Sequence, residues 1–181
     1  NASRGPVVDN AALRVRLDEA HAPRVVLDVW EGEPAIDRRL LQRVALGTAH
    51  IAGYSLDGKW QATRLLRDAL HAHLGLPPGE SSALARDNHS RVTNPVAAPQ
   101  GLTDAQLLRW LVQARYDIRI DDALLRQALA DDASGQAFDQ LRKHYRERRE
   151  LAGSMVTGVH PAQLALVRAL GCTPVDDARS D

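Results

Sequence analysis

The spacing of apolar residues predicts alternating helices and strands in the first third of the chain. An apolar stripe at helical spacing follows Asp9, a good helix N-cap, and stops before Pro23, so a helix is expected between them. The nearly continuous apolar run over residues 25–29 is typical of a strand buried on both faces. A short helix over 38–43 and a second strand over 44–48 follow. Helices and strands in this order favour an α/β fold with a parallel sheet.

A long amphipathic helix is expected next. Ser55 can cap it, and its apolar stripe continues to about His73, before Gly75 and a Pro-Pro-Gly triplet. Residues 76–101 hold four of the nine prolines and few large apolar side chains. This composition predicts a linker and a domain boundary.

The remainder of the chain mixes charged helices with short alternating segments. The expected elements are a helix with a Thr103–Gln106 capping box, a strand over 116–120, a helix capped by Asp121 or Asp122, a charged helix over 136–150, a strand over 154–157, and a helix from Pro161 to Gly171. This order predicts a small α+β unit.

Composition excludes several classes of function. The chain has 23 basic and 23 acidic side chains, so no long-range field steers it toward nucleic acid or an anionic membrane. The single cysteine, Cys172, excludes an internal disulfide and a cysteine metal cluster, and it fits a reducing compartment. No apolar run approaches the length of a membrane span, and the first residues lack a secretory signal pattern. A cytoplasmic location is therefore expected.

Two polar clusters, His71 with His73 and a basic run within residues 142–149, are interpreted as ordinary surface features. His71 and His73 are two residues apart on a helix and point to different faces, so no metal site is predicted. The basic run within residues 142–149 is interleaved with acidic residues, which favours a solvated helix face over a nucleic-acid site.

Two charged residues near the start of the chain are candidates for ligand binding. Arg4 lies in a turn before Gly5 and Pro6; it is either a surface residue or a fork-shaped cation that binds a carboxylate through two hydrogen bonds. Asp28 lies within an apolar run, where a charge is costly to bury without a partner. It would lie near the carboxyl end of a strand, where parallel sheets bind ligands. Alternatively, it satisfies loop amides.

Glu33 and His50 are candidates for acid–base chemistry because each follows a predicted strand and the two can meet above the sheet. A carboxylate on one imidazole nitrogen fixes the tautomer and stabilises the protonated ring. The other nitrogen can then exchange a proton with a substrate. An isolated histidine is more often a structural residue, so the spacing alone leaves both interpretations open.

Together these motifs resemble a known family. The segments 1–5, 27–34 and 50–53 are similar to the second half of the cofactor domain in NAD-dependent D-2-hydroxyacid dehydrogenases. The resemblance implies an α/β fold in which residues 1–54 form the C-terminal portion of a Rossmann-like NAD-binding domain with parallel strands. Residues 55–75 would form a helix returning to a substrate domain that has no counterpart here, 76–101 a linker, and 102–181 an α+β dimerisation domain.

The resemblance also implies roles for individual residues, with hydride passing from the substrate C2 to NAD. Arg4 would bind the substrate carboxylate and polarise the C2 oxygen, Glu33 would orient His50, His50 would take the hydroxyl proton, Asp28 would hold the nicotinamide end of NAD, Gly53 would allow close backbone approach, and Tyr54 would contact the substrate.

Tyr54, where many relatives have glycine, and the C-terminal segments favour a phosphorylated 2-hydroxy acid as substrate and a homodimer formed through the C-terminal domain. A glycine-rich phosphate loop has no counterpart in the sequence. The chain therefore looks like part of a longer enzyme, and we expect it to be inactive alone. The alternatives are a dehydrogenase for another 2-hydroxy acid, such as phosphoglycerate, and a non-catalytic dimerisation module.

Overall fold

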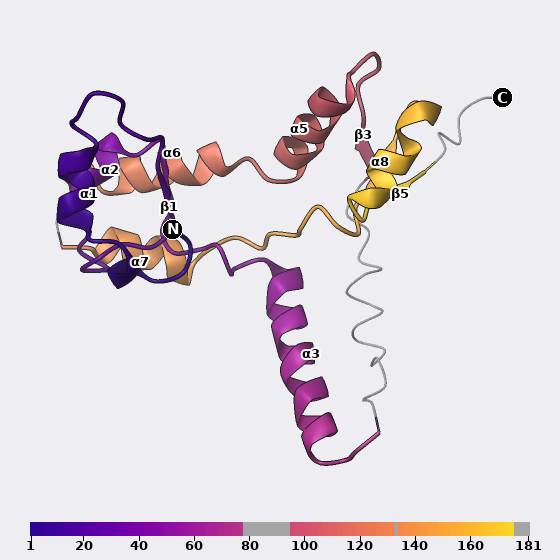
Figure 1. Ribbon diagram of the computed structural model, residues 1–181, viewed down its shortest axis with the longest axis horizontal. Helices are drawn as coiled ribbons and strands as arrows, with labels where there is room; N and C mark the ends of the chain where they lie inside the picture. The colour runs from indigo at the N-terminus through magenta and orange to yellow at the C-terminus, as the bar shows by residue number, and fades with distance from the viewer. Residues whose placement is uncertain (78–94, 133, 176–181) are drawn as a thin grey trace. The chain divides into compact units, whose positions relative to one another are not determined.

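The protein divides into two compact units in a computed structural model that describes residues 1–77, 95–132 and 134–175 (Figure 1). The first unit comprises Asn1–Tyr54 and Asp117–Glu147, and the second comprises Ser55–Tyr116 and Arg148–Asp181. Within each unit the strands pair in parallel, so the predicted α/β class is confirmed.

The first unit has a two-stranded parallel sheet, β1–β2, in which Val26 is paired with Leu46 and Leu27 with Gly47. Both strands are shorter than predicted. The elements of the unit are η1 (Gly5–Val7), α1 (Asn10–Arg16), β1 (Val26–Leu27), α2 (Arg38–Arg43), β2 (Leu46–Gly47), α6 (Ile118–Ala128) and α7 (Gln136–Lys143). As predicted, Asp9 caps α1, and its side chain accepts a hydrogen bond from Ala12 N at 2.9 Å.

One hydrophobic core joins the two sequence segments of the first unit. Trp30 and Leu40 from the first segment pack in the same cluster as Leu125 and Phe138 from α6 and α7. Phe138 is fully buried, and burying a side chain of this size contributes about 1.5–3 kcal/mol. The helices α6 and α7 are therefore integral to the unit that holds the candidate site.

The strand predicted over 116–120 is wrong. Asp117 caps a helix there, with its carboxylate accepting from Arg119 N at 3.0 Å, and α6 continues to Ala128. Arg119 also donates to the Asp117 carboxylate, and this hydrogen bond lowers the pKa of Asp117 below its ordinary value. The alternation over five residues equally fits the first turn of a helix, and the cap decides between the two. The charged helix predicted over 136–150 ends at Lys143.

The second unit has a three-stranded parallel sheet with the order β3–β4–β5. Its elements are α3 (Leu56–His73), β3 (Val96–Ala97), α5 (Asp104–Arg115), β4 (Met155–Thr157), η2 (Pro161–Gln163), α8 (Leu164–Ala169) and β5 (Thr173–Pro174). Thr103 and Gln106 form the predicted capping box on α5. The core contains Leu107, Val156, Val167 and Cys172, and burial raises the pKa of the Cys172 thiol.

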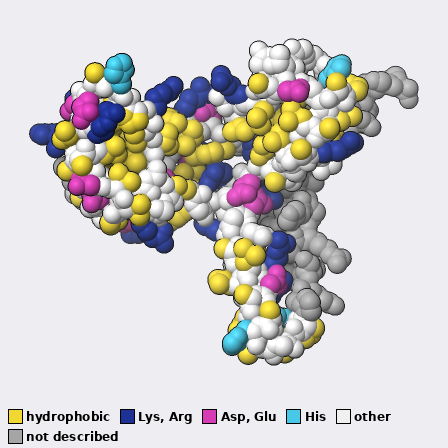
Figure 2. Space-filling model, viewed as in Figure 1, with side chains coloured by type: hydrophobic (Ala, Val, Ile, Leu, Met, Phe, Trp, Pro, Cys, Tyr) yellow, Lys and Arg dark blue, Asp and Glu magenta, His cyan; other side chains and the backbone are white. Residues whose placement is uncertain are grey.

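The N-terminus of α3 is anchored to a segment far along the chain. The Asp57 carboxylate accepts from the Arg149 guanidinium, with the shortest contact at 2.8 Å, and from Glu150 N at 2.7 Å. Ser55 caps the helix as predicted and donates to Glu150 Oε1 at 2.6 Å. Beyond this anchor the helix buries no residue, and Figure 2 shows apolar side chains along its exposed surface. No helix in the described ranges is long and apolar enough to cross a membrane.

The compact units differ from the domain boundaries drawn from the sequence. The segment predicted as one unit, 102–181, is divided, because residues 117–147 bury their apolar side chains against residues 1–54. The boundary after Tyr54 is the same in the compact units and in the division drawn from the sequence. Most of the predicted linker, 78–94, lies outside the described residues, but its end forms β3, which pairs with β4.

Candidate active site

The candidate site lies where the two parallel strands of the first unit end. Asp28 directly follows β1, and Thr48 directly follows β2. Because the carboxyl ends of parallel strands meet at one edge of a sheet, the loops after β1 and β2 converge there. These loops carry four of the predicted site residues: Asp28, Glu33, His50 and Gly53.

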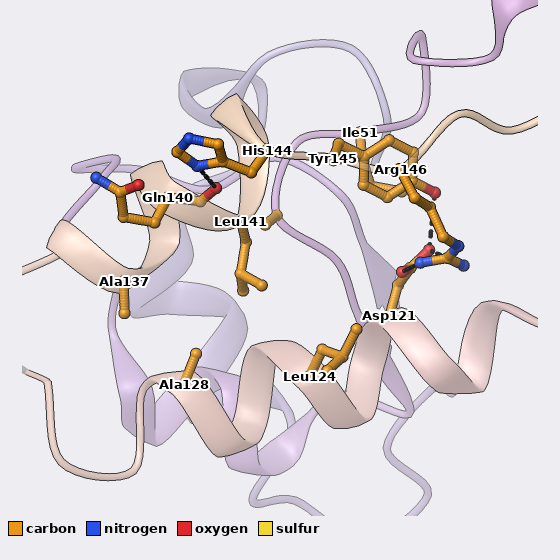
Figure 3. A pocket seen from close by; sticks show the side chains of 11 residues that line it. Ile51, Asp121, Leu124, Ala128, Ala137, Gln140, Leu141, His144, Tyr145 and Arg146 are labelled. Carbon is orange, nitrogen blue, oxygen red and sulfur yellow. Dashed lines mark hydrogen bonds and ion pairs between the residues drawn. The ribbon is translucent and has the colours of Figure 1, made fainter.

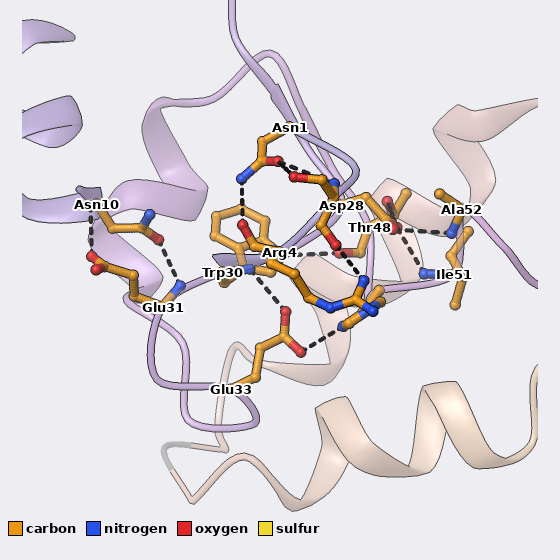
Figure 4. A network of polar contacts seen from close by, with 12 residues as sticks. Asn1, Arg4, Asn10, Asp28, Trp30, Glu31, Glu33, Thr48, Ile51 and Ala52 are labelled. Carbon is orange, nitrogen blue, oxygen red and sulfur yellow. Dashed lines mark hydrogen bonds and ion pairs between the residues drawn. The ribbon is translucent and has the colours of Figure 1, made fainter. Parts of the chain in front are cut away.

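Asp28 holds the loop that follows β2. Its side chain is only 6% exposed. Oδ1 accepts from Thr48 Oγ1 at 2.6 Å and from Ile51 N at 2.7 Å, and Oδ2 accepts from Ala52 N at 3.0 Å (Figure 4). Of the two interpretations open from the sequence, this geometry supports loop amides as partners of the carboxylate. The predicted contact with nicotinamide stays a prediction.

His50 occupies the left-handed backbone region, with φ of 55°. This conformation costs a residue with a side chain roughly 1–2 kcal/mol. The Asp28 carboxylate offsets that cost by binding the two amides after His50, while His50 N donates to Asp28 O at 2.7 Å. Hydrogen bonds therefore fix the backbone on both sides of the His50 imidazole.

Glu33 and His50 are in contact. His50 Nδ1 and Glu33 Oε2 lie 2.8 Å apart, and the other carboxylate oxygen accepts from Trp30 N at 2.8 Å. Both side chains are partly exposed, His50 by 28% and Glu33 by 18%. Within the described part of the chain, His50 Nε2 has no hydrogen-bond partner. A carboxylate on Nδ1, with Nε2 left for another partner, is an arrangement suited to moving a proton.

Trp30 supports the Glu33 side of this pair. The indole is buried, and its Nε1 donates to Thr48 O at 3.0 Å, which ties the β1 loop to the β2 loop. Its backbone carbonyl also lies against Gly5, where an added Cβ would come within 2.0 Å of Trp30 O. Only glycine therefore lets the turn that carries Arg4 approach the loop that carries Glu33.

Arg4 belongs to the same polar network, but among the described residues it makes no hydrogen bond or ion pair to Glu33 or His50 (Figure 4). Its carbonyl accepts from Asn1 Nδ2 at 2.9 Å, and Asn1 O in turn accepts from Asp28 N at 2.9 Å. The exposed guanidinium donates to Ser3 O at 2.7 Å, which leaves most of its donors for an anion.

Gly53 and Tyr54 complete the predicted set. A Cβ on Gly53 would meet nothing within 4 Å, so its backbone is open to approach. The half-buried Tyr54 ring makes an edge-to-face contact with Tyr145, with the ring centroids 5.9 Å apart. Tyr145 and Thr48 were not predicted as site residues from the sequence. The position of Thr48, a hydroxyl residue at the end of a predicted strand, could have indicated it. No pattern in the sequence around Tyr145 indicates a role in the site.

The described residues contain no group of three His, Cys, Asp or Glu side chains able to hold a metal ion.

The fold and the site can be compared with known protein families. Residues 1–52 match the family model described as "D-isomer specific 2-hydroxyacid dehydrogenase, NAD binding domain", and the predicted resemblance is confirmed. By this match, the first part of the chain is similar to the NAD binding domain of the D-isomer specific 2-hydroxyacid dehydrogenases. Residues 91–171 match a second model, described as a domain of unknown function, DUF3410.

The particular relatives share one name. The chain is 44% identical over 173 residues to the erythronate-4-phosphate dehydrogenase of Pectobacterium atrosepticum, covering 94% of this chain and 44% of the relative. It is 47% identical over 175 residues to the enzyme of the same name from Ectopseudomonas mendocina, covering 94% of this chain and 46% of the relative. The chain thus spans less than half the length of these curated relatives.

Proposed function

We propose that the protein containing this chain is an NAD-linked dehydrogenase that oxidises the C2 hydroxyl of 4-phosphoerythronate to a 2-oxo acid, as a step in pyridoxal 5'-phosphate biosynthesis. The observation that carries the proposal is the 2.8 Å contact between Glu33 and His50, on a turn fixed by Asp28. The match of residues 1–52 to an NAD binding domain and the shared name of the relatives support the choice of cofactor and substrate.

The residues present fit their part of such a reaction. Glu33 orients the imidazole, so that Nε2 of His50 can take the proton of the C2 hydroxyl. The exposed guanidinium of Arg4 would bind the substrate carboxylate through paired hydrogen bonds. Gly53 would lie against the nicotinamide end of NAD, because its backbone is open, and Asp28 would act there through the turn it holds. NAD, when bound, supplies the hydride acceptor.

The proposal is tested by measuring NADH formation by the complete enzyme, with 4-phosphoerythronate and 3-phosphoglycerate as substrates. We expect kcat/KM to favour 4-phosphoerythronate by at least about 10-fold, since a site built around one polar substrate discriminates strongly against another. The isolated 181-residue chain is expected to give no turnover.

Each other outcome contradicts a defined part of the proposal. A preference for 3-phosphoglycerate would overturn the substrate, and turnover by the isolated chain would overturn its dependence on the rest of the enzyme. Oxidation of neither acid would leave the non-catalytic dimerisation module as the better interpretation.

We also propose that the complete protein is a cytoplasmic homodimer. The single cysteine is a free, buried thiol, which fits a reducing compartment.

In support of the dimer, α5 leaves Leu108 and Val112 exposed on its surface, by 39% and 45%. Apolar side chains of this size are common at subunit interfaces. We expect sedimentation equilibrium at micromolar concentration to give twice the monomer mass, and replacing both residues by Gln to shift the protein toward monomer. A monomeric mass for the unsubstituted enzyme would contradict this.

A further inference from the structure

The segment that follows α7 in the first unit meets the loop that carries His50. Tyr145 follows α7, and its ring lies at 87° to the ring of Tyr54, with centroids 5.9 Å apart. Edge-to-face pairs at this separation attract each other beyond the area they bury. Tyr54 lies four residues after His50, so this contact acts directly on the end of the His50 loop.

Tyr145 is itself held in place. Its hydroxyl donates to Asp121 Oδ2 at 2.9 Å, and Asp121 is only 6% exposed (Figure 3). The guanidinium of Arg146 donates to both oxygens of the same carboxylate. A buried carboxylate with a hydroxyl and a guanidinium as partners is a rigid anchor, because each of its oxygens is engaged.

The anchor is connected to the sheet that carries the candidate site. The residue next to it, Asp122, accepts from Gly47 N of β2 at 2.7 Å, and Arg126 one turn later donates to Leu41 O at 2.6 Å. Both bonds join α6 to the first segment of the unit. These bonds fix α6 relative to β2, the strand that leads to His50. Because Tyr145 is hydrogen-bonded to Asp121 of α6, its position is fixed relative to β2 as well.

A cavity of about 460 Å³ lies between these helices and the His50 loop. Ala49 and Ile51, the neighbours of His50, line it together with Leu124 of α6 and Leu141 of α7. Tyr145 lines the same cavity, so it borders both the cavity and Tyr54 (Figure 3).

We propose that Tyr145, anchored by Asp121, is a positioning residue that orients Tyr54 toward the substrate. Residues 117–147, within the region that matches the domain of unknown function, thereby complete the active site as well as the fold. This inference rests on the proposed function, in which Tyr54 contacts the phosphorylated hydroxy acid.

The contact itself can be tested on the 181-residue chain without any activity. The chain has three tyrosines, so labelling with 3-fluorotyrosine gives three fluorine resonances, assigned by single Tyr→Phe substitutions. We expect Tyr145→Leu to shift the Tyr54 resonance, because the ring current of Tyr145 is lost. Tyr116→Leu is the matched control: Tyr116 lies in the other unit, against the Arg148 guanidinium. An unchanged Tyr54 resonance in Tyr145→Leu would overturn the positioning role.

The consequence for catalysis is tested in the complete enzyme. Tyr145→Leu is expected to raise KM for 4-phosphoerythronate about 3- to 10-fold, the range set by one aromatic pair, with little change in kcat or in the Kd for NAD. Tyr145→Phe keeps the ring but loses the hydroxyl that binds Asp121, so a KM between those of the unsubstituted enzyme and Tyr145→Leu is expected. If Tyr145→Leu does not fold, Tyr145→Met, which fills the volume with a flexible side chain, replaces it.

The outcomes separate this inference from the proposed function. An active enzyme whose KM is unchanged by Tyr145→Leu, or changed equally by Tyr116→Leu, would overturn the inference alone. An enzyme that oxidises neither hydroxy acid would overturn the proposed function, while the fluorine resonances would still decide whether Tyr145 orients Tyr54.

Discussion

Replacing His50 by asparagine in the complete enzyme is expected to lower kcat about 100- to 10,000-fold, the range contributed by a positioned general base. The Kd for NAD is expected to change little, because the backbone that holds the His50 loop is bonded to Asp28 and not to the imidazole. The measurement is NADH formation under saturating substrate, with NAD binding followed separately by calorimetry.

Asparagine is the informative substitution because of the backbone conformation at this position. His50 has φ of 55°, and asparagine is among the residues that tolerate the left-handed region best. The turn should therefore survive while the proton-transferring nitrogen is lost. His21 provides the matched control: it has φ of 61°, is exposed, and lies outside the site. Turnover that survives in His50→Asn, or falls equally in His21→Asn, would refute the acid–base role.

The contact between Glu33 and His50, on which this expectation rests, could be predicted from the sequence. Glu33 and His50 each follow an apolar run of the kind that forms a parallel strand, and parallel strands bring their carboxyl ends to one edge. Strand identity and direction thus determined that the two loops would be neighbours. The left-handed turn at His50 was not predictable in the same way. It depends on the Asp28 carboxylate reaching Ile51 N and Ala52 N, which is a tertiary contact.

The packing partners of the helices in the C-terminal half could not be predicted from the sequence pattern. The apolar stripe of α6 is visible in the sequence, but nothing in it states which surface the stripe covers. Leu125 and Phe138 pack on the Trp30 core and not on Leu107 and Val156, and this choice divides the predicted 102–181 unit. Contacts such as Tyr54 with Tyr145 then follow from packing between segments about 90 residues apart.

Asp28→Ala is expected to cost the first unit about 3 kcal/mol or more of its free energy of unfolding. The substitution removes the acceptor that Thr48 Oγ1, Ile51 N and Ala52 N share, and a hydrogen bond to a charged group contributes about 1.5–3 kcal/mol. It also removes the support for the left-handed turn at His50. Urea unfolding of the 181-residue chain measures this loss. Fluorescence of the buried Trp30 reports on the first unit when the other two tryptophans are replaced by phenylalanine.

Two further variants separate the hydrogen bonds of Asp28 from its charge. Asp28→Asn keeps an oxygen for Thr48 and Ile51 but turns an amide NH₂ toward Ala52 N, so an intermediate loss is expected. Asp18→Ala removes an exposed carboxylate that pairs with Arg43 at 2.7 Å in the same unit, and should cost only about 0–1 kcal/mol. If Asp28→Ala costs no more than Asp18→Ala, the carboxylate does not hold the turn. In that case its place at the strand end is better explained by direct contact with a ligand.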